Sequence, residues 1–225
     1  MIRYLHLLPL LTLIGCSRCQ PPDQVDPPPD LLLELDGMSF TRSEVEEYGR
    51  YIREEVDHRI GQLALTETVL DKVLIPMKLA RRAFPEQRAQ KEKHARALST
   101  YVGNQGVAEL AARGHTLGGY RPESPLTRNS LPLPVSRYVF DESNLGQVSP
   151  PIEVPQGYCV IASYDLERGL TRVSDRADVY QVPFYTHGGD EFAAWYQGAR
   201  EALKGRVTYA HPDVLDGLPP WLKNP

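Results

Sequence analysis

The sequence predicts an α+β fold, in which a helix-rich N-terminal half precedes a smaller sheet. Three observations predict it. Apolar residues recur at helical spacing in residues 41–56 and 63–84. Short runs of β-branched and aromatic residues, bounded by turn residues, occupy residues 158–164 and 179–185. The 20 prolines gather between these segments and therefore mark connectors.

The composition excludes several classes of function. The chain has 225 residues, of which 41% are hydrophobic, enough for one or two domains with a core. Its 25 basic and 29 acidic residues give a net charge of −4, without the basic stripe that nucleic-acid binding requires. His58, His187 and His211 are scattered and lack metal-ligand spacing. We therefore expect no metal, no cofactor and no nucleic-acid partner.

Residues 1–15 have the features of an export signal. Arg3 supplies a short positive region, and residues 7–14 are apolar but too few to cross a bilayer as a helix. The segment ends in the sequence LIGC, which resembles the bacterial lipobox. This resemblance implies cleavage before Cys16 and lipidation of that cysteine, so that acyl chains hold the protein on a membrane. The alternative is an ordinary signal peptide with an incidental cysteine.

Residues 16–30 are rich in proline and predict a stiff, extended tether between anchor and folded part. Ser17 follows the lipidated Cys16, and an Asp in place of Ser17 would favour a different destination. We therefore expect the outer membrane, on the side that faces the periplasm. If Cys16 is acylated, Cys19 and Cys159 remain, and an exported protein can oxidise such a pair. The sequence leaves open whether these two cysteines pair or stay free.

The first folded elements are a hairpin and a capped helix. Residues 31–40 predict two short strands joined by the Asp36-Gly37 turn. Thr41 and Glu44 have the spacing of a capping box, which begins a helix. The apolar face of this helix follows at helical spacing: Val45, Tyr48, Ile52 and Val56.

Further helices follow. Residues 63–84 carry an apolar band, and Pro76 should kink or break this helix near Val73. Residues 87–101 predict a more polar helix with a solvated, charged face. Residues 107–121 predict a helix that ends in a glycine-rich turn, and residues 122–135 a proline-punctuated loop.

Residues 138–165 are the most informative stretch and predict turns alternating with strands. Residues 139–140 close a short apolar element, and residues 141–146 supply turn chemistry. Residues 148–154 contain two prolines, so this broken strand should lie at an edge or bulge. Residues 158–164 have few breakers and predict a buried strand.

The C-terminal quarter predicts a polar connector over residues 168–175, a strand over residues 179–185 and a last short strand over residues 206–210. Between the strands, residues 191–203 predict a helix. Its buried stripe is Phe192, Trp195, Tyr196, Ala199 and Leu203. The proline-rich tail, residues 211–225, is either a surface strap or disordered.

Short motifs within residues 138–165 resemble the second half of a parvulin-type peptidyl-prolyl isomerase domain. They are VF, LGQVSPP and GYCVI, in that order. Residues 33–48, with a hairpin and a Thr-capped helix, are similar to the opening of SurA-type periplasmic chaperones. The alternative is a β-hairpin in an unrelated α+β protein.

The resemblance implies a SurA-like helical chaperone domain with a reduced parvulin-like α/β unit. The C-terminal strand–helix–strand would pack back on the helical domain and end in the proline-rich tail. The expected boundaries are residues 1–15 for the signal peptide, 16–30 for the tether, 31–106 for the helical domain, 107–168 for the parvulin-like domain and 169–225 for the C-terminal part.

Parvulins place two histidines, on the first and last strands, around a Cys or Asp beside an apolar proline pocket. In this chain Cys159 stands at the last-strand histidine position, and no apolar run with a central histidine precedes Val107. The resemblance leaves Cys159, Phe140 and Tyr158 as candidate site residues, each of which is equally a packing residue. Because no histidine is recognisably paired with Cys159, we interpret it as a core thiol rather than a nucleophile.

These observations favour a lipid-anchored folding factor of the cell envelope, a parvulin relative that binds unfolded or partly folded exported proteins and has weak or lost isomerase activity. One alternative is an active peptidyl-prolyl isomerase that uses different residues. Another is a structural lipoprotein subunit of an envelope complex.

Overall fold

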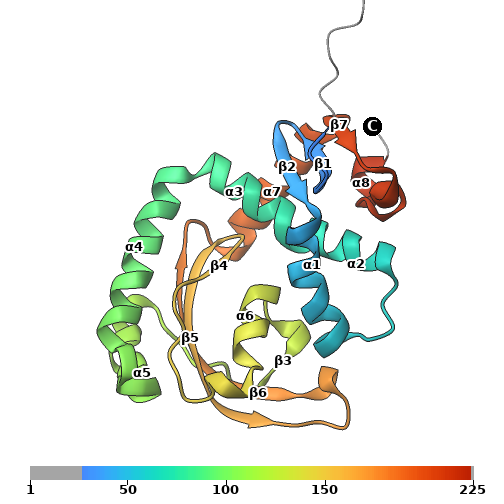
Figure 1. The fold of residues 1–225 in the computed structure, drawn as a ribbon. Coiled ribbons are helices and arrows are strands. Elements are labelled where there is room, and N and C mark those ends of the chain that lie inside the picture. The colour runs from blue at the N-terminus through green and yellow to red at the C-terminus, as the bar shows by residue number, and fades with distance from the viewer. Residues whose placement is uncertain (1–26, 224–225) are drawn as a thin grey trace, which may run out of the picture.

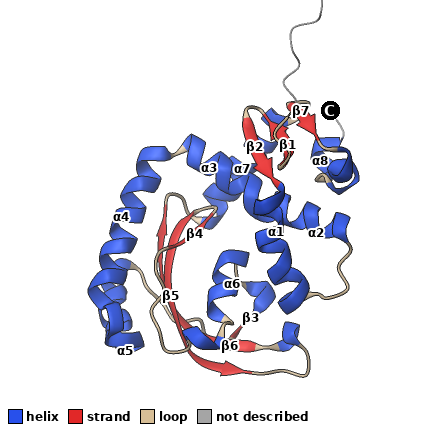
Figure 2. Cartoon of the chain, viewed as in Figure 1, coloured by secondary structure: helices blue, strands red, loops and turns tan. Residues whose placement is uncertain are grey.

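The computed structural model describes residues 27–223 and shows an α+β protein, as the sequence predicts. Within this range eight α-helices accompany two antiparallel sheets (Figure 1, Figure 2). One sheet has the strand order β2-β1-β7, and the other has the order β3-β6-β5-β4 and curls into a half-barrel. The predicted signal peptide, Cys16, Cys19 and the tether up to residue 26 lie outside the described residues.

The predicted hairpin is confirmed and consists of β1 (Leu31–Leu35) and β2 (Met38–Thr41). Asp36 and Gly37 have φ angles of 50° and 75°, the left-handed conformation that tight hairpin turns require. The last strand, β7 (Val207–Ala210), pairs antiparallel with the other edge of β1. One small sheet therefore joins the two ends of the described chain.

The predicted capping box begins α1 (Arg42–Tyr51). The Thr41 hydroxyl accepts a hydrogen bond from the Glu44 backbone N–H, and the Glu44 carboxylate accepts one from the Thr41 N–H at 2.9 Å. The helix then continues as a five-residue π-helix, Ile52–Val56. Such widened turns are rare and often occur at functional sites.

Where Pro76 was expected to kink or break the helix near Val73, the structure has a π-helical segment. The chain passes from α2 (Gln62–Val69) through a second π-helix, Leu70–Leu74, into α3 (Ile75–Ala83). Proline lacks an N–H group, and the residue before it bonds to the carbonyl five residues back rather than four. The helix is therefore widened at this point and not interrupted.

The curled sheet is built on the long antiparallel pair of β5 (Gly157–Glu167) and β6 (Arg176–Tyr185). β4 (Ile152–Val154) lies at one edge, as its neighbouring prolines predict, although the strand is shorter than expected. The short β3 (Leu126–Thr127) lies at the other edge. The sheet thus has long central strands and short edges, which limits edge-to-edge association.

Helices cover both faces of this sheet (Figure 1). α4 (Pro85–Val102) and α5 (Gly106–Gly114) pack on the outer face, where Val160 contributes to the core. α6 (Leu133–Val139) lies on the inner face, where the next residue, Ile161, is buried. Because both faces are covered, β5 is an almost continuous apolar run rather than an alternating one.

The prediction of a loop over residues 122–135 is wrong, because the segment contains β3 and the start of α6. Pro132 immediately precedes the helix and Pro134 lies in its first turn, where a missing N–H removes no helical hydrogen bond. Val139 and Phe140, expected to close a short element, close this helix. Two of the four prolines that suggested a loop are thus helix-start residues.

The C-terminal elements pack on the N-terminal helices. α7 (Gly189–Leu203) places its predicted stripe against them, and Phe192 and Leu203 are buried. The tail forms a 3₁₀-helix, Pro212–Gly217, and α8 (Pro220–Lys223). It is a strap whose apolar side chains enter the first core: Val214, Leu218 and Leu222.

A buried arginine joins α4 to the turn between β4 and β5. The Arg88 side chain is 4% exposed, and its guanidinium donates to the carbonyl oxygens of Pro155 at 2.7 Å and Val154 at 3.1 Å. It also donates to Glu153 Oε1 at 2.7 Å, and Arg81 of α3 bonds to the same carboxylate. Because an unpaired buried guanidinium is costly, these bonds fix the hairpin turn against the helix.

Replacing Gly157 with alanine should destabilise the fold. Gly157 has a φ angle of 152°, and a Cβ there would overlap the backbone carbonyl oxygen of Phe184 on β6. We expect Gly157→Ala to lower the free energy of unfolding by about 2–3 kcal/mol in urea unfolding followed by circular dichroism. The matched control is Gly198→Ala in α7, where a Cβ meets nothing within 4 Å. It should stabilise by about 0.5–1 kcal/mol, and equal effects of both changes would contradict the close approach at Gly157.

Candidate functional site

The structure brings together two of the three predicted site residues. Cys159 on β5 and Phe140 at the end of α6 lie in the apolar cluster between α6 and the sheet, with exposed fractions of 1% and 3%. Tyr158 points to the opposite face, because successive side chains alternate along a strand. Its hydroxyl donates to Glu92 Oε2 of α4 at 3.3 Å. Tyr158 therefore lies apart from the other two.

Burial raises the pKa of the Cys159 thiol to about 12, so this thiol is protonated at neutral pH. Cys159 forms no disulfide within residues 27–223, and its cluster includes Val139 of α6 and Val154 of β4. Nucleophilic chemistry requires an accessible thiolate, and this thiol is neither accessible nor ionised. The geometry favours the interpretation of Cys159 as a core thiol.

Residues 27–223 contain no group of three or more His, Cys, Asp or Glu side chains that could hold a metal ion. None of the helices in that range is both long enough and apolar enough to cross a bilayer. The larger cavities lie between the N-terminal helices and the curled sheet.

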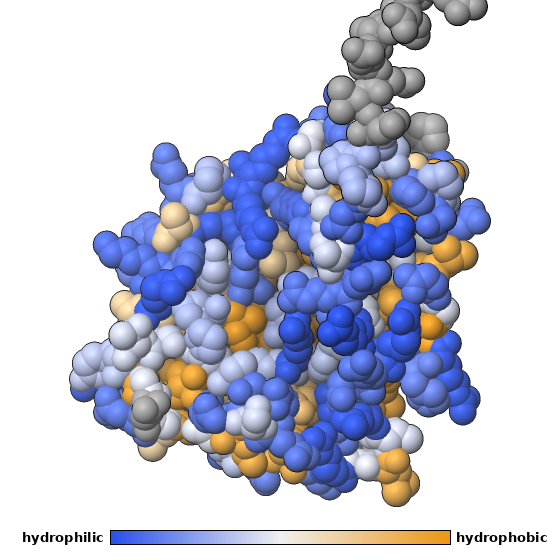
Figure 3. Space-filling view, in the orientation of Figure 1, coloured by the Kyte–Doolittle hydropathy of each residue, from blue (hydrophilic) through white to orange (hydrophobic). Residues whose placement is uncertain are grey.

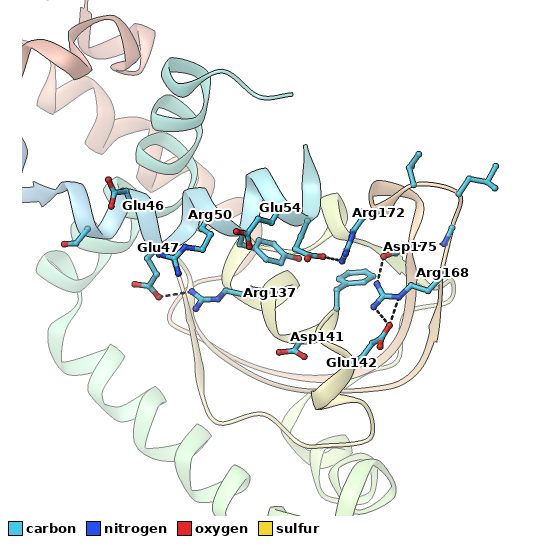
Figure 4. Close-up of a pocket in the computed structure, with 17 residues that line it drawn as sticks. Glu46, Glu47, Arg50, Glu54, Arg137, Asp141, Glu142, Arg168, Arg172 and Asp175 are labelled. Carbon is cyan, nitrogen blue, oxygen red and sulfur yellow. Dashed lines mark hydrogen bonds and ion pairs between the residues drawn. The ribbon is translucent and has the colours of Figure 1, made fainter. Parts of the chain in front are cut away.

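The first cavity, which we call the acidic cleft, has a volume of about 1020 Å³ and lies between α1, the end of α6 and the connector of residues 168–175 (Figure 4). Seven carboxylates and four guanidiniums line it, an excess of three negative charges. The acidic residues are Glu46, Glu47, Glu54, Glu55, Asp141, Glu142 and Asp175, and the basic ones are Arg50, Arg137, Arg168 and Arg172.

Three of these arginines are neutralised by carboxylates of the same cleft (Figure 4). Arg137 pairs with Glu47, Arg168 with Glu142 and Asp175, and Arg172 with Glu55. Among the lining residues, Glu46, Glu54 and Asp141 have no ion-pair partner in the part of the chain that the structure describes. In the same range Arg50 is the one lining arginine without such a partner, so the unpaired side chains carry a net charge of −2.

The second cavity, the apolar cleft, has a volume of about 980 Å³ and adjoins the first, with which it shares Glu54, Glu55, Thr171 and Arg172. Both π-helices contribute to its wall. Its apolar lining residues are Ile52, Val56, Ile60, Val73, Leu131, Pro132, Leu133 and Val173. Figure 3 shows that hydrophilic side chains cover most of one face of the molecule, with apolar residues in smaller groups between them.

A buried ion pair forms the floor between the clefts. The Arg128 side chain is 0% exposed and donates to Asp175 Oδ2 at 2.8 Å and to the Tyr51 hydroxyl at 3.0 Å. Its guanidinium lies 4.5 Å from the centre of the Phe140 ring. Arg168 donates to the same Asp175 oxygen at 2.6 Å. The network therefore fixes α1, α6 and the connector of residues 168–175 relative to one another.

The Asp175 carboxyl is held in its ionised form. Burial by itself raises the pKa of this group, but hydrogen bonds from Arg128, Arg168 and the Gly169 backbone N–H outweigh burial. The pKa of Asp175 consequently lies below the usual range for an aspartate. The two guanidiniums therefore keep a negative charge inside the protein at neutral pH.

Sequence analysis does not single out Arg128 or Asp175, because their segments are predicted to be a loop and a connector. Their side chains meet although they are 47 residues apart in the chain. The one local signal is the density of charge in residues 168–175, a short connector between two strands. A local sequence pattern identifies such charged residues but not the residues with which they pair.

A scan against protein-family models finds no match for this chain, and searches of curated proteins and of solved structures find none either.

Replacing Asp175 with asparagine should weaken the fold in a pH-dependent way. The variant leaves the buried Arg128 without its closest carboxylate, and we expect a loss of about 3 kcal/mol in the free energy of unfolding at pH 7. Because folding lowers the pKa of Asp175, its stabilisation is complete above the ordinary value near 3.8 and is lost as the pH falls through the folded-state pKa. The difference between wild type and Asp175→Asn should therefore shrink below about pH 4.

The matched control is Asp213→Asn, which removes an aspartate–arginine pair whose side chains are 63% and 42% exposed. Exposed pairs contribute little, so this change should alter the free energy of unfolding by less than about 1 kcal/mol at every pH. Denaturant unfolding at several pH values measures both variants. A pH-independent loss for Asp175→Asn would refute the role given to its charge.

Proposed function

We propose that this chain is a lipid-anchored folding factor of the cell envelope that binds unfolded exported proteins and has weak or no prolyl isomerase activity. The arrangement of residues 138–165 carries the proposal. The segment that resembles a parvulin half-domain follows the order helix α6, turn and hairpin β4–β5, and β6 lies beside β5. This order supports the resemblance, since the motif residues belong to one packed unit.

Two features support binding rather than catalysis. Neither β5 nor β6 contains a histidine, whereas the resemblance implies one on each of two strands around the catalytic position. Pro183 of β6 stands opposite Cys159 in the strand register, and Cys159 is buried and protonated. A packing residue, Cys159, therefore occupies the last-strand position at which an isomerase of this family would carry a histidine.

The placement of the clefts supports a role in holding other chains. β1, where the described chain begins, and the connector of residues 168–175 lie toward opposite ends of the molecule (Figure 1). A tether that joins the protein at β1 would therefore leave the rim of the clefts directed away from the membrane. Open clefts between helices and a sheet suit extended peptides, which bind through a few pockets for alternate side chains.

Purified mature protein in detergent micelles should suppress aggregation of an unfolded outer-membrane protein at stoichiometric concentration. It should change the isomerisation rate of a proline-containing peptide, whose uncatalysed barrier is about 18–20 kcal/mol, by less than about twofold, because Cys159 is buried and protonated and β5 and β6 carry no histidine. Light scattering and a protease-coupled isomerisation assay measure the two effects.

Cys159→Ala is the control for this experiment. Acceleration that disappears in the variant would make the protein an active isomerase and contradict the proposal. Neither acceleration nor suppression, together with a stable stoichiometric partner in a pull-down, would identify a structural lipoprotein instead.

Cys16→Ser should abolish lipidation in the producing cell. We expect the wild type to incorporate radiolabelled palmitate and to sediment with the outer membrane, because acyl chains supply about 0.8 kcal/mol of membrane affinity for each buried methylene. The variant should incorporate no label, whereas Cys19→Ser should behave as wild type. Equal labelling of both variants would refute the assignment of Cys16.

A further inference from the structure

We propose that the acidic cleft and the apolar cleft together bind one extended peptide segment, which places a lysine or arginine side chain in the first and an apolar side chain in the second. The inference rests on the proposed function and specifies which segments of an unfolded chain the protein holds. We call the combined surface the peptide groove. Its continuity follows from the four lining residues that the two clefts share.

The length of the groove fits a short extended segment. Ser43 lines its acidic end and Val56 its apolar end, and both belong to the continuous helix formed by α1 and its π-helical extension. Thirteen helical steps span about 20 Å, the length of about six residues in extended conformation. A basic and an apolar side chain separated by a few residues can therefore occupy both clefts at once.

The charge of the acidic cleft favours a ligand with a positively charged side chain. Its paired arginines are already neutralised, and the unpaired carboxylates of Glu46, Glu54 and Asp141 outnumber the unpaired Arg50. Glu46 and Glu54 are exposed, so they attract a basic side chain without any rearrangement of the fold. An acidic segment meets repulsion at the same place.

The apolar cleft supplies the second contact. Its rim includes Val173, which is 40% exposed, and the neighbouring loop tip carries Leu170, which is fully exposed. Apolar groups in such positions gain free energy when another apolar group covers them. They stand on the connector that the Arg128–Asp175 pair joins to the segment after β3.

The Arg172–Glu55 ion pair lies where the two clefts meet, since both residues line both cavities. The pair satisfies the arginine, which would otherwise compete with a basic ligand for the carboxylates. It also joins the connector to the end of α1. A peptide that fills both clefts therefore passes over the Arg172–Glu55 pair and does not have to break it.

The test uses the mature protein in detergent micelles and fluorescein-labelled peptides of about ten residues in a glycine–serine background. One peptide contains lysine and leucine, a second has glutamate for lysine, and a third has serine for leucine. Fluorescence anisotropy should show the tightest binding for the lysine–leucine peptide. This binding should weaken as salt is added, because ionic strength screens exposed charges.

The double variant Glu46→Gln/Glu54→Gln should bind the lysine–leucine peptide about fivefold more weakly, because the lysine loses its partly exposed ion pair at whichever of the two carboxylates it meets. Glu46→Lys/Glu54→Lys should instead prefer the glutamate peptide. Val173→Asp should reduce the advantage of leucine over serine. The matched control is Glu86→Gln on α4, which removes an exposed carboxylate outside the groove and should leave binding unchanged.

Equal binding of the lysine and glutamate peptides by wild type, or unchanged binding in Glu46→Gln/Glu54→Gln, would overturn the inference. Suppression of aggregation, measured on the same samples, separates it from the proposed function. If wild type suppresses aggregation but binds none of the peptides, the groove inference fails and the folding factor stands. If suppression is also absent, both fail.

Discussion

The need to neutralise a completely buried guanidinium sets the arrangement of the clefts. Arg128 has no access to solvent, so it must find its hydrogen-bond partners within the protein. It finds them on Tyr51 of α1 and on Asp175 of the connector, and it covers the ring of Phe140 at the end of α6. Three segments that are distant in the sequence are thereby fixed around one charge. Removal of that charge would leave the clefts without a defined floor.

Arg88 applies the same constraint at the opposite edge of the sheet. It ties α4 to the turn between β4 and β5 through the carbonyl oxygens of Pro155 and Val154. Between these two anchors, the β5–β6 pair has apolar cores on both faces, with α4 and α5 outside and α6 inside. A strand with two buried faces leaves little room for a polar catalytic group. Because side chains alternate between these two faces, Cys159 and Tyr158, which are adjacent in sequence, belong to different cores.

Local sequence patterns predict the elements well where the determinants are local. The Asp36-Gly37 turn and the capping box at Thr41 depend on residues within a few positions of one another. The same approach misses α6, because prolines are typical both of loops and of the first helical turn. It also misses the clefts, since Glu55 and Arg172 meet across 117 residues. Long-range charge pairing has no periodicity that a single sequence displays.

The proposed function agrees with a site that is wide and charged rather than closed and apolar. An isomerase gains from an enclosed pocket that favours the twisted amide over the planar one, because only differential binding accelerates a reaction. A factor that holds many unfolded chains needs the opposite, a surface that accepts varied segments and releases them. Both cavities are open to solvent, and the ion pairs at Arg137 and Arg172 lie at their surface and not in a sealed interior. Pairs of this kind contribute little affinity but accelerate encounter and reject the wrong sign of charge. Buried Arg128 therefore fixes the segments that line the groove, and exposed Glu54 gives the groove its selectivity.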